Sequence, residues 1–315
     1  PTVFTNEAGA SAIPDDTLHW KASDAGSGMT LVFAKLKNGD VNERQERWPS
    51  VIPKLTVDGQ WSRVWDMRDD AQDPDDPATW TYSDNLFLCA LDALRQNPFR
   101  PYPLTHIDLA MWRAAADAAD ELVALKDGGK EQRYRIAGTV AFEGSELEDI
   151  VGPMLAAAAA RLTRAGGRVG VTPGVWRAPA ATIRDSYEAV QWSTARPPAE
   201  MATELRVTYS PEKRQHEPAE LPPWPIPGAA AAGLPPSVRR VDITMCPSDG
   251  QAQRVRQIIG RRMLLQKRAT VMGGGEAMAL LTGSTATLAL PEPYGSYVNG
   301  DFEVTGMHPF LDPVG

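Results

Sequence analysis

The chain has 315 residues, of which 43% are hydrophobic and 23% are charged, and its formal net charge at pH 7 is −8. These values are typical of a globular protein with two or three domains, each long enough to bury a core. The sequence contains no run of the ~20 apolar residues that a membrane-spanning helix needs. Its first residues also lack the basic-then-apolar pattern of a secretion signal, and stable membrane insertion is not expected.

The charge is distributed unevenly along the chain. Residues 1–80 carry 8 basic and 14 acidic side chains, whereas Arg239–Arg268 carry 8 basic and 2 acidic ones. A basic segment can bind nucleic acid, but this acidic chain has no nucleic-acid motif. A solvated face, or a subunit contact with the acidic region of a neighbour, is therefore favoured. The predicted subunit-interface residues are Arg254, Arg261 and Arg268, and we expect the arginines of Gln251–Arg268 to pair mostly with protein carboxylates.

Catalytic, cofactor and metal sites are not predicted. The two cysteines, Cys89 and Cys246, lie far apart, and the position of Cys89 on an apolar stripe favours a buried thiol over a disulfide. The four histidines are not grouped as metal ligands usually are. The acidic segment Arg68–Pro77 offers hard oxygen ligands for calcium, but it lacks the EF-hand spacing and its Asp-Pro steps form turns. Calcium therefore remains an alternative for this loop.

Three helices are predicted between Asp84 and Ala165. The first follows a short strand in Thr79–Phe99 and is capped by Ser83 or Asp84. The second is capped at Thr105, and the third begins at the capping box Ser145–Glu148 and continues to the Gly166-Gly167 stop with a kink at Pro153. Their predicted buried positions are Leu86, Cys89, Ala90, Ala93 and Leu94; Trp112, Ala115, Ala116, Ala119, Leu122 and Val123; and Leu147, Ile150, Val151, Met154, Leu155, Ala158 and Leu162. The acids Asp117, Asp120 and Glu121 fall on a polar helix face and are expected to be solvated.

The remaining pattern is mainly that of strands and turns. Strands are predicted at Met29–Leu36, Arg133–Phe142, Leu205–Tyr209, Val238–Met245, Ala277–Leu281, Thr285–Leu290 and Phe302–Met307, with hairpins over Val51–Trp65 and Arg168–Trp176. The eight prolines of Pro211–Pro236 indicate an extended insertion. Ser248–Gln251 is a capping box that opens one long helix near Gln251–Leu265. The triple glycine Gly273–Gly275 lacks the flanking strand and Lys-Ser/Thr of a phosphate loop.

Taken in order, three groups of residues resemble the central hub region of the tail-tip attachment proteins of long-tailed bacteriophages, the lambda J-like proteins, and of gene transfer agents. The first, Pro77–Leu94 (PATWTYSDNLFLCALDAL), is similar to the family's Thr-Trp-x-Tyr-Ser-x-Asn-Pro-Ala stretch, although Leu86 stands where the family commonly has proline. The other groups are Ile107–Val123 with Glu131–Val140, and Leu205–Arg214 with Asp249–Leu264 and Asn299–Met307. Together they span about Trp65 to the C-terminus.

The resemblance implies a structural virion protein and no enzyme. Similar hubs are homotrimers at the distal end of the tail, assembled in the host cytoplasm, in which two barrel-like domains per subunit form a pseudo-sixfold ring around the DNA path. The implied partners are the distal tail and tail tube proteins, the tape measure protein and further tip or fibre proteins. DNA would pass through without sequence-specific binding, and the family carries no catalytic residue or cofactor in this region.

The predicted fold class is α+β, a β-rich hub with barrel-like domains and a helical α+β domain in the middle. The predicted domains are a β-rich segment at 1–78, belonging to a barrel-like hub domain; an α+β domain with three helices at 79–200; and a barrel-like hub domain with one helix at 201–315, carrying the insertion at 211–236.

Two alternatives remain. A tail-associated hydrolase of cell wall or polysaccharide would need paired carboxylates, an activated nucleophile or a metal set, and no such motif is present. A carbohydrate-binding module is suggested by nine tryptophans. Trp80, Trp112 and Trp176 are predicted to face the core, however, which favours packing over sugar binding.

Overall fold

A computed structural model describes residues 3–5, 32–34, 46, 59–142, 147–193, 201–229, 231, 233–265 and 267–308. The chain divides into two compact units, Pro1–Gly59 and Gln60–Gly315. In the first unit, β1 (Val3–Thr5) pairs antiparallel with β2 (Val32–Ala34), which lies within the strand predicted at Met29–Leu36. The arm Val51–Val57 of the predicted hairpin lies outside the described residues.

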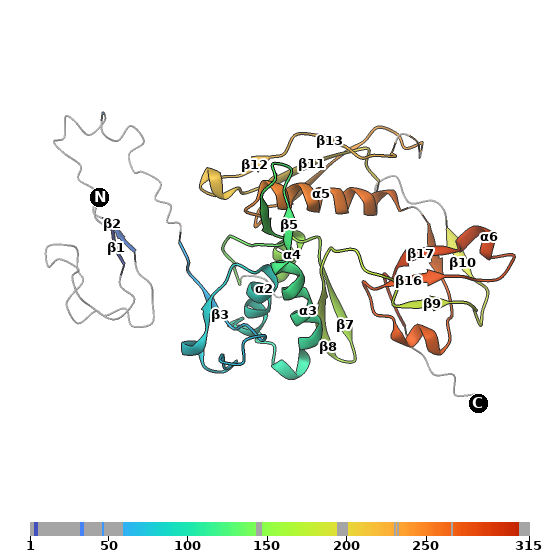
Figure 1. Cartoon of the computed structure of the whole chain (residues 1–315), viewed down its shortest axis with the longest axis horizontal. Coiled ribbons are helices and arrows are strands. Elements are labelled where there is room, and N and C mark those ends of the chain that lie inside the picture. Colours follow the sequence, from blue (N-terminus) through green and yellow to red (C-terminus); the bar gives the residue numbers. More distant parts are fainter. Residues whose placement is uncertain are drawn as a thin grey trace. The chain divides into compact units, whose positions relative to one another are not determined.

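The second unit mixes helices with small sheets, in agreement with the α+β prediction (Figure 1). Its described strands form sheets of two to four strands, and none of these sheets closes into a barrel. β3 (Arg63–Val64) pairs antiparallel with β4 (Thr81–Tyr82), so the segment around Trp61–Trp65 pairs with a later strand.

The three helices predicted between Asp84 and Ala165 are confirmed as α2 (Leu86–Arg95), α3 (Leu109–Asp120) and α4 (Leu147–Ala156). Two of the predicted caps are wrong. Asn85, not Ser83 or Asp84, caps α2, because its Oδ1 accepts hydrogen bonds from the amides of Phe87 and Leu88 while its Nδ2 donates to the Ala116 carbonyl at 2.9 Å.

The second wrong cap is at the start of α3. Asp108 caps this helix by accepting a hydrogen bond from the Met111 amide, because Thr105 lies within a preceding 3-10 turn, Leu104–His106. The predicted cap at Ser145 lies outside the described residues.

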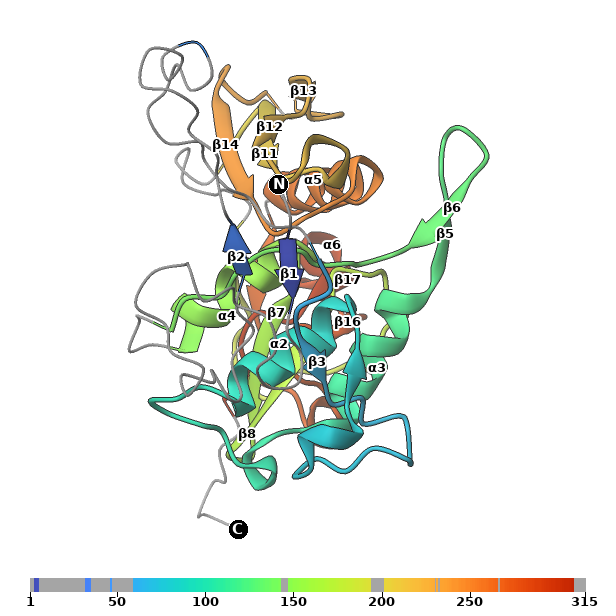
Figure 2. The same cartoon turned by 90° about the vertical axis from the view of Figure 1, so that its left-hand side faces the viewer.

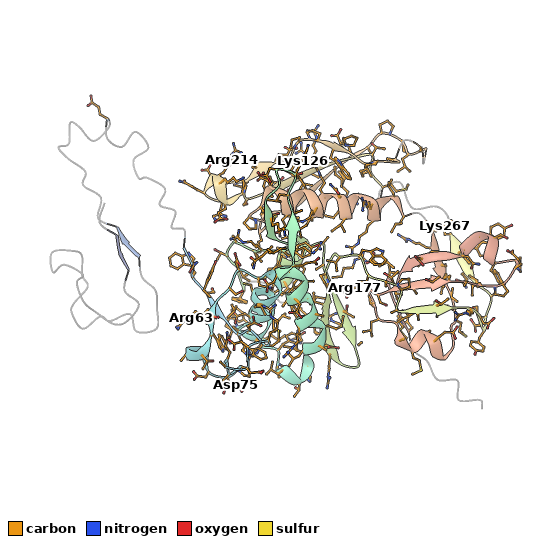
Figure 3. The ribbon with its side chains drawn as sticks, in the orientation of Figure 1. Arg63, Asp75, Lys126, Arg177, Arg214 and Lys267 are labelled. Atoms are coloured by element: carbon orange, nitrogen blue, oxygen red, sulfur yellow. The ribbon has the colours of Figure 1, made fainter. Side chains whose placement is uncertain are left out.

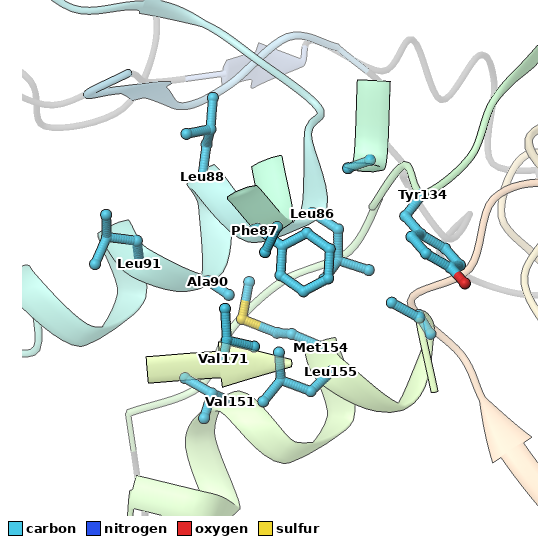
Figure 4. Close-up of a cluster of buried hydrophobic side chains, with 14 of the residues drawn as sticks. Leu86, Phe87, Leu88, Ala90, Leu91, Tyr134, Val151, Met154, Leu155 and Val171 are labelled. Atoms are coloured by element: carbon cyan, nitrogen blue, oxygen red, sulfur yellow. The ribbon is translucent and has the colours of Figure 1, made fainter. Parts of the chain in front are cut away.

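Helix α2 is the centre of the main core. None of its ten residues is exposed, and seven of them are buried. Phe87 meets the ring of Tyr134 edge to face, with centroids 6.3 Å apart, and the side chains of Val151, Met154 and Val171 surround it (Figure 4). Of the predicted stripe, only Cys89 is partly rather than fully buried. The prediction of a single buried stripe therefore underestimates how far the helix is enclosed.

Two predicted helices end earlier than expected, and a hairpin follows each. Helix α3 ends at Asp120, and β5 (Leu122–Ala124) turns back into β6 (Lys130–Gln132), so Leu122 is exposed and not part of the buried face. Helix α4, with Pro153 inside it, ends at Ala156, and β7 (Arg161–Ala165) pairs with β8 (Arg168–Thr172). Gly166 and Gly167 form the tight turn of this hairpin with positive φ angles, 56° and 77°, that glycine adopts without strain.

These hairpins replace other predicted strands. Because β8 pairs antiparallel with the preceding strand β7, the hairpin predicted over Arg168–Trp176 does not form. Trp176 is 85% exposed and does not face the core as predicted. The region Arg133–Phe142 is mostly irregular after β6, with one isolated bridge between Asn85 and Arg135.

A second layer covers one side of the helices. Its four-stranded sheet contains β11 (Glu204–Tyr209), flanked on one edge by β12 (Ala219–Glu220) and β13 (Trp224–Pro225) from the proline-rich insertion, and on the other by β14 (Val238–Ile243) in parallel. Helix α5 (Asp249–Leu264) packs on this sheet and is capped, as predicted, by Ser248. Its Ala252 and Val255 join the core of the three helices.

The C-terminal module has its own small core. Here β9 (Ala181–Ile183), β16 (Thr285–Leu288) and β17 (Gly300–Glu303) form one sheet, and β10 (Gln191–Ser193) with β15 (Arg268–Thr270) forms another. The short helix α6 (Gly295–Val298) and the 3-10 helix Gly275–Ala279 pack beside them. The predicted strand at Ala277–Leu281 is thus mostly a 3-10 helix. The glycines before it lead into that helix.

Gln251 joins the helical layer to α5. Its side chain is fully buried; Oε1 accepts from the Arg135 amide, and Nε2 donates to the carbonyls of Arg135 and Ala157, each at 2.9 Å. In the predicted capping box, Gln251 would return a hydrogen bond to Ser248, but the structure directs this amide across the layers instead.

We expect Gln251→Ala to lower the free energy of unfolding by about 3–5 kcal/mol, because it leaves three backbone polar groups buried without their partner. Gln253→Ala, an exposed position on the same helix, is the matched control and should change stability by less than about 0.5 kcal/mol. Urea denaturation measures both. Equal effects of the two substitutions would contradict the role given to Gln251.

Candidate subunit interface

The basic segment Arg239–Arg268 extends over β14, α5 and β15, and contacts within the chain hold Arg254, Arg256 and Arg262. Arg254 pairs with Glu131 at 2.8 Å and donates to the Arg133 carbonyl. Arg262 pairs with Glu303 at 3.3 Å and donates to the Ala159 carbonyl. These contacts bind α5 to the β5–β6 hairpin and to the C-terminal module, so both arginines stabilise contacts within the chain.

Arg256 shows that pairing with a carboxylate is not general in this segment. Its guanidinium donates to the Pro222 carbonyl at 2.8 Å and lies 5.3 Å from the centroid of the Trp224 ring. Burial lowers the pKa of this guanidinium. Arg256 therefore fastens the proline-rich insertion onto α5.

The structure places the three predicted interface residues in different surroundings. Arg254 is partly buried and occupied by Glu131. Arg261, two helical turns further along α5, is exposed and has no ion pair in the described part of the chain. Arg268 is exposed on β15, in the C-terminal module, opposite Ser193. Their role in a subunit contact remains a prediction, to which Arg261 is best suited by its position.

An open sheet edge is the feature that the sequence prediction missed. β14 pairs with β11 along its full length, from Glu204↔Val238 to Tyr209↔Ile243, and no described strand pairs with its other edge (Figure 2). Val238 is 56% exposed, and Arg239, Arg240 and Asp242 are exposed as well. Unpaired strand edges readily accept another strand, and charged side chains on them limit non-specific pairing. The strand pattern with two adjacent arginines was the available signal.

The arginines of this edge have no ion pair with any described residue. In the parallel register Arg240 lies beside Arg206, whose charge is already balanced by Glu204 at 3.2 Å and Glu220 at 4.0 Å. Arg239 lies beside Leu205, and Leu205 in turn approaches Gly260 of α5. A Cβ at Gly260 would come within 2.6 Å of the Trp224 ring, so glycine allows the close packing that brings this end of α5 against the sheet. Arg261 follows directly, at the same end of the layer as Arg239.

An acidic surface lies on the other side of the helical layer from α5. Asp69, Asp70, Asp73, Asp75 and Asp76 are all exposed in the loop that precedes β4 (Figure 3, where Asp75 is labelled). Two side chains hold the backbone of this loop: Trp80 Nε1 donates to the Asp73 carbonyl at 2.7 Å, and Arg95 donates to the Pro74 carbonyl at 2.6 Å. Arg95 itself lies between Trp65 and Trp80, 4.9 and 5.8 Å from the ring centroids.

The carboxylates of this loop mainly organise its turns. Asp69, Asp73 and Asp76 each accept a hydrogen bond from the backbone amide two residues later. Among the described residues, no group of three His, Cys, Asp or Glu side chains is arranged to hold a metal ion. Asp117 and Asp120, expected to be solvated, both form ion pairs with Arg68, at 3.1 and 2.8 Å. Glu121 pairs with Arg133 at 2.8 Å.

No protein-family model matches the chain, and no curated protein matches it. In the part of the chain that the structure describes, no helix is both long and apolar enough to cross a bilayer.

The acidic groups whose pKa is strongly raised lie in the core and not in the Asp-rich loop. Burial raises the pKa of the thiols of Cys89 and Cys246 to about 12, so neither is ionised at neutral pH. Burial also raises the pKa of Asp92, on the enclosed helix α2, to about 6, although nearby Arg95 opposes this shift. Its Oδ1 is buried and makes no hydrogen bond.

Asp92 should therefore make the protein less stable as pH rises from about 4 to about 6. The folded state holds the proton in this interval while the unfolded state, with the ordinary pKa of 3.8, releases it. We expect Asp92→Asn to remove this loss and to stabilise the protein at pH 7 by up to about 3 kcal/mol. Urea denaturation of both proteins between pH 4 and 7 measures the difference.

Asp70→Asn, which removes an exposed carboxylate, is the control for a general effect of charge. A stability difference between wild type and Asp92→Asn that stays constant from pH 4 to 7 would show that ionisation of Asp92 is not its cause.

Proposed function

We propose that the chain is a structural virion protein, a tail-tip hub that joins the tail tube to the distal tip and surrounds the DNA exit path. The observation that carries this proposal is the open edge of β14 with Arg239 and Arg240, which have no charge partner within the described residues. An exposed, regular edge with unbalanced charge is suited to a protein partner. The ordered resemblance to phage tail hubs supports the identity of that partner as a further subunit.

The proposed assembly is a homotrimeric ring with head-to-tail contacts. In such a contact one surface of a subunit meets a different surface of its neighbour, and the contacts close when the rotation between subunits is 120°. The basic edge on β14 (labelled in Figure 2) and the Asp-rich loop (Asp75 is labelled in Figure 3) lie on different sides of the second unit, which is the arrangement that head-to-tail contact requires. In this proposal Arg239, Arg240 and Arg261 face carboxylates of the neighbouring copy.

The proposed DNA path also favours neutralised arginines. Arginines that line a bore would bind phosphates and hold the genome in place, with an affinity that increases with each contact. A hub through which DNA passes therefore benefits when its basic side chains are neutralised by protein. Arg254 and Arg262 are neutralised within the chain, by Glu131 and Glu303. We propose that neighbouring copies neutralise Arg239, Arg240 and Arg261.

The finer architecture also belongs to the proposal. The segments 1–78 and 201–315 would each contribute to a barrel-like hub domain, which addition of a neighbouring strand to β14 would help to close. The helical domain at 79–200 would lie between them. The tail tube, distal tail, tape measure and tip or fibre proteins would bind the assembled ring at the virion's distal end.

We expect the double substitution Arg239→Glu and Arg240→Glu to prevent ring formation, because it replaces attraction to an acidic neighbour by repulsion. Light scattering coupled to gel filtration should give three chains for the wild type and one for the variant, and electron microscopy should show threefold rings only for the wild type.

Arg100→Glu with Arg168→Glu makes the same charge change at two exposed positions away from the edge, and this control should still assemble. A wild-type monomer or twofold dimer would refute the ring. A ring that survives the Arg239 and Arg240 substitutions would refute the edge as its contact surface.

We further propose that the chain is not an enzyme. Asp117 and Asp120 are the carboxylates that a catalytic acid/base pair would most readily use. Both form ion pairs with Arg68, and both cysteines are protonated. The purified chain should release no soluble fragments from peptidoglycan or from bacterial polysaccharide, in an assay that detects lysozyme as a positive control. Turnover that Asp117→Asn or Asp120→Asn abolishes would establish the hydrolase alternative.

A further inference from the structure

Three aromatic side chains form a cluster at the surface of the C-terminal module. Trp192 of β10 stacks on Tyr297 of α6, with centroids 5.4 Å apart and planes at 22°, and meets Tyr294 edge to face at 6.0 Å. Trp192 is 42% exposed and Tyr297 is 53% exposed. Clustered exposed aromatics are unusual on a free surface and mark interaction sites, unlike single exposed apolar residues.

Local structure explains why the three rings meet. Tyr294 and Tyr297 are three residues apart at the start of α6, so they project from the same side of this short helix. Trp192 stands opposite Ala269 in the β10–β15 pair, where the small alanine leaves room for an indole. In Figure 1, β10 and α6 lie side by side in this module.

The polar atoms of these rings distinguish them from aromatic residues of the core. In the core, Trp80 and Trp112 donate their indole N–H groups to the carbonyls of Asp73 and Val169, and the hydroxyls of Tyr134 and Tyr209 bind Gly174 and Asp249. The indole N–H of Trp192 and the hydroxyls of Tyr294 and Tyr297 have no hydrogen-bond partner among the described residues. The cluster thus combines apolar ring faces with three free hydrogen-bonding groups.

The net charge of the module disfavours an anionic ligand. Residues 175–193 and 267–308 carry four basic and six acidic side chains, a surplus of two negative charges. Beside the rings, Ser296 donates to Glu292 at 2.6 Å, which adds a carboxylate acceptor. A nucleic acid would need positive charge along its backbone. A neutral ligand with many hydroxyl groups is compatible with this environment.

We propose that Trp192, Tyr294 and Tyr297 form a binding site for a neutral oligosaccharide. One face of a sugar ring presents C–H groups with partial positive charge, which complement the negative face of an aromatic ring. Its hydroxyls donate to Glu292 and exchange hydrogen bonds with the two phenols, while the Trp192 N–H donates to a sugar oxygen. The site is independent of the proposed ring contact, because β14 and Asp69–Asp76 take no part in it.

The test is isothermal titration of the full chain with maltohexaose, cellohexaose and chitohexaose. We expect at least one of them to bind, and Tyr297→Ala to weaken that binding by at least about tenfold, as truncation of an aromatic anchor does. Tyr297→Phe keeps the ring and removes only its hydroxyl, and it should have a smaller effect. Trp176→Ala removes an even more exposed aromatic residue outside the cluster, and this variant should bind as the wild type does.

Each other outcome overturns the proposal. No binding of any hexasaccharide at millimolar concentration, or equal binding by Tyr297→Ala, would exclude the sugar site. Binding of oligo(dT) that depends on Tyr297, without binding of sugar, would assign the cluster to single-stranded nucleic acid. A change of oligomeric state in Tyr297→Ala, without binding of sugar, would assign it to a subunit contact.

Discussion

The enclosure of α2 is the constraint on which the main fold depends. A helix with no exposed residue has to be covered on every side, and here α3, α4, the β7–β8 hairpin and the segment around Tyr134 provide that cover. Each covering element then has an outer face that carries a further layer. The Arg135 backbone, next to Tyr134, donates its N–H to Gln251 Oε1 and accepts a hydrogen bond from Gln251 Nε2, and this contact fixes α5 over the helices. Packing around one helix thereby determines where the sheet containing β14 can lie.

The sequence predicted elements well where one local signal was sufficient. Ser248 caps α5 because no competing cap precedes it, and the alternation of β11 matches its burial. Prediction was less successful where several residues were equally suitable. Ser83, Asp84 and Asn85 can all cap a helix, and the choice of Asn85 depends on its second hydrogen bond, to Ala116, which is distant in sequence. Helical spacing from Leu147 to Leu162 also concealed the hairpin, because Leu162 is partly buried in β7 just as it would be in a helix.

Interaction surfaces were harder to predict than elements, since charge and composition do not reveal which side chains already have partners. Arg254 and Arg261 are both arginines of α5 in the same basic segment, and the sequence does not distinguish them. Yet Arg254 is bound to Glu131, in a hairpin more than a hundred residues earlier. Trp176 and Trp192 are both partly or largely exposed, and only the tertiary structure places Trp192 beside two tyrosines. The open edge of β14 likewise depends on which strand it pairs with, a fact that no local pattern contains.

The proline-rich insertion has a consequence for how many copies one sheet can connect. By placing β12 and β13 along one side of β11, it occupies that side and leaves β14 as the long unpaired edge of the described sheet. Such a sheet offers one long edge to which a strand of another copy can add. Two copies that joined through identical β14 edges would form a closed pair and could not add a third copy. A ring of three therefore requires each β14 to meet a surface of another kind, and the insertion is the segment that imposes this requirement.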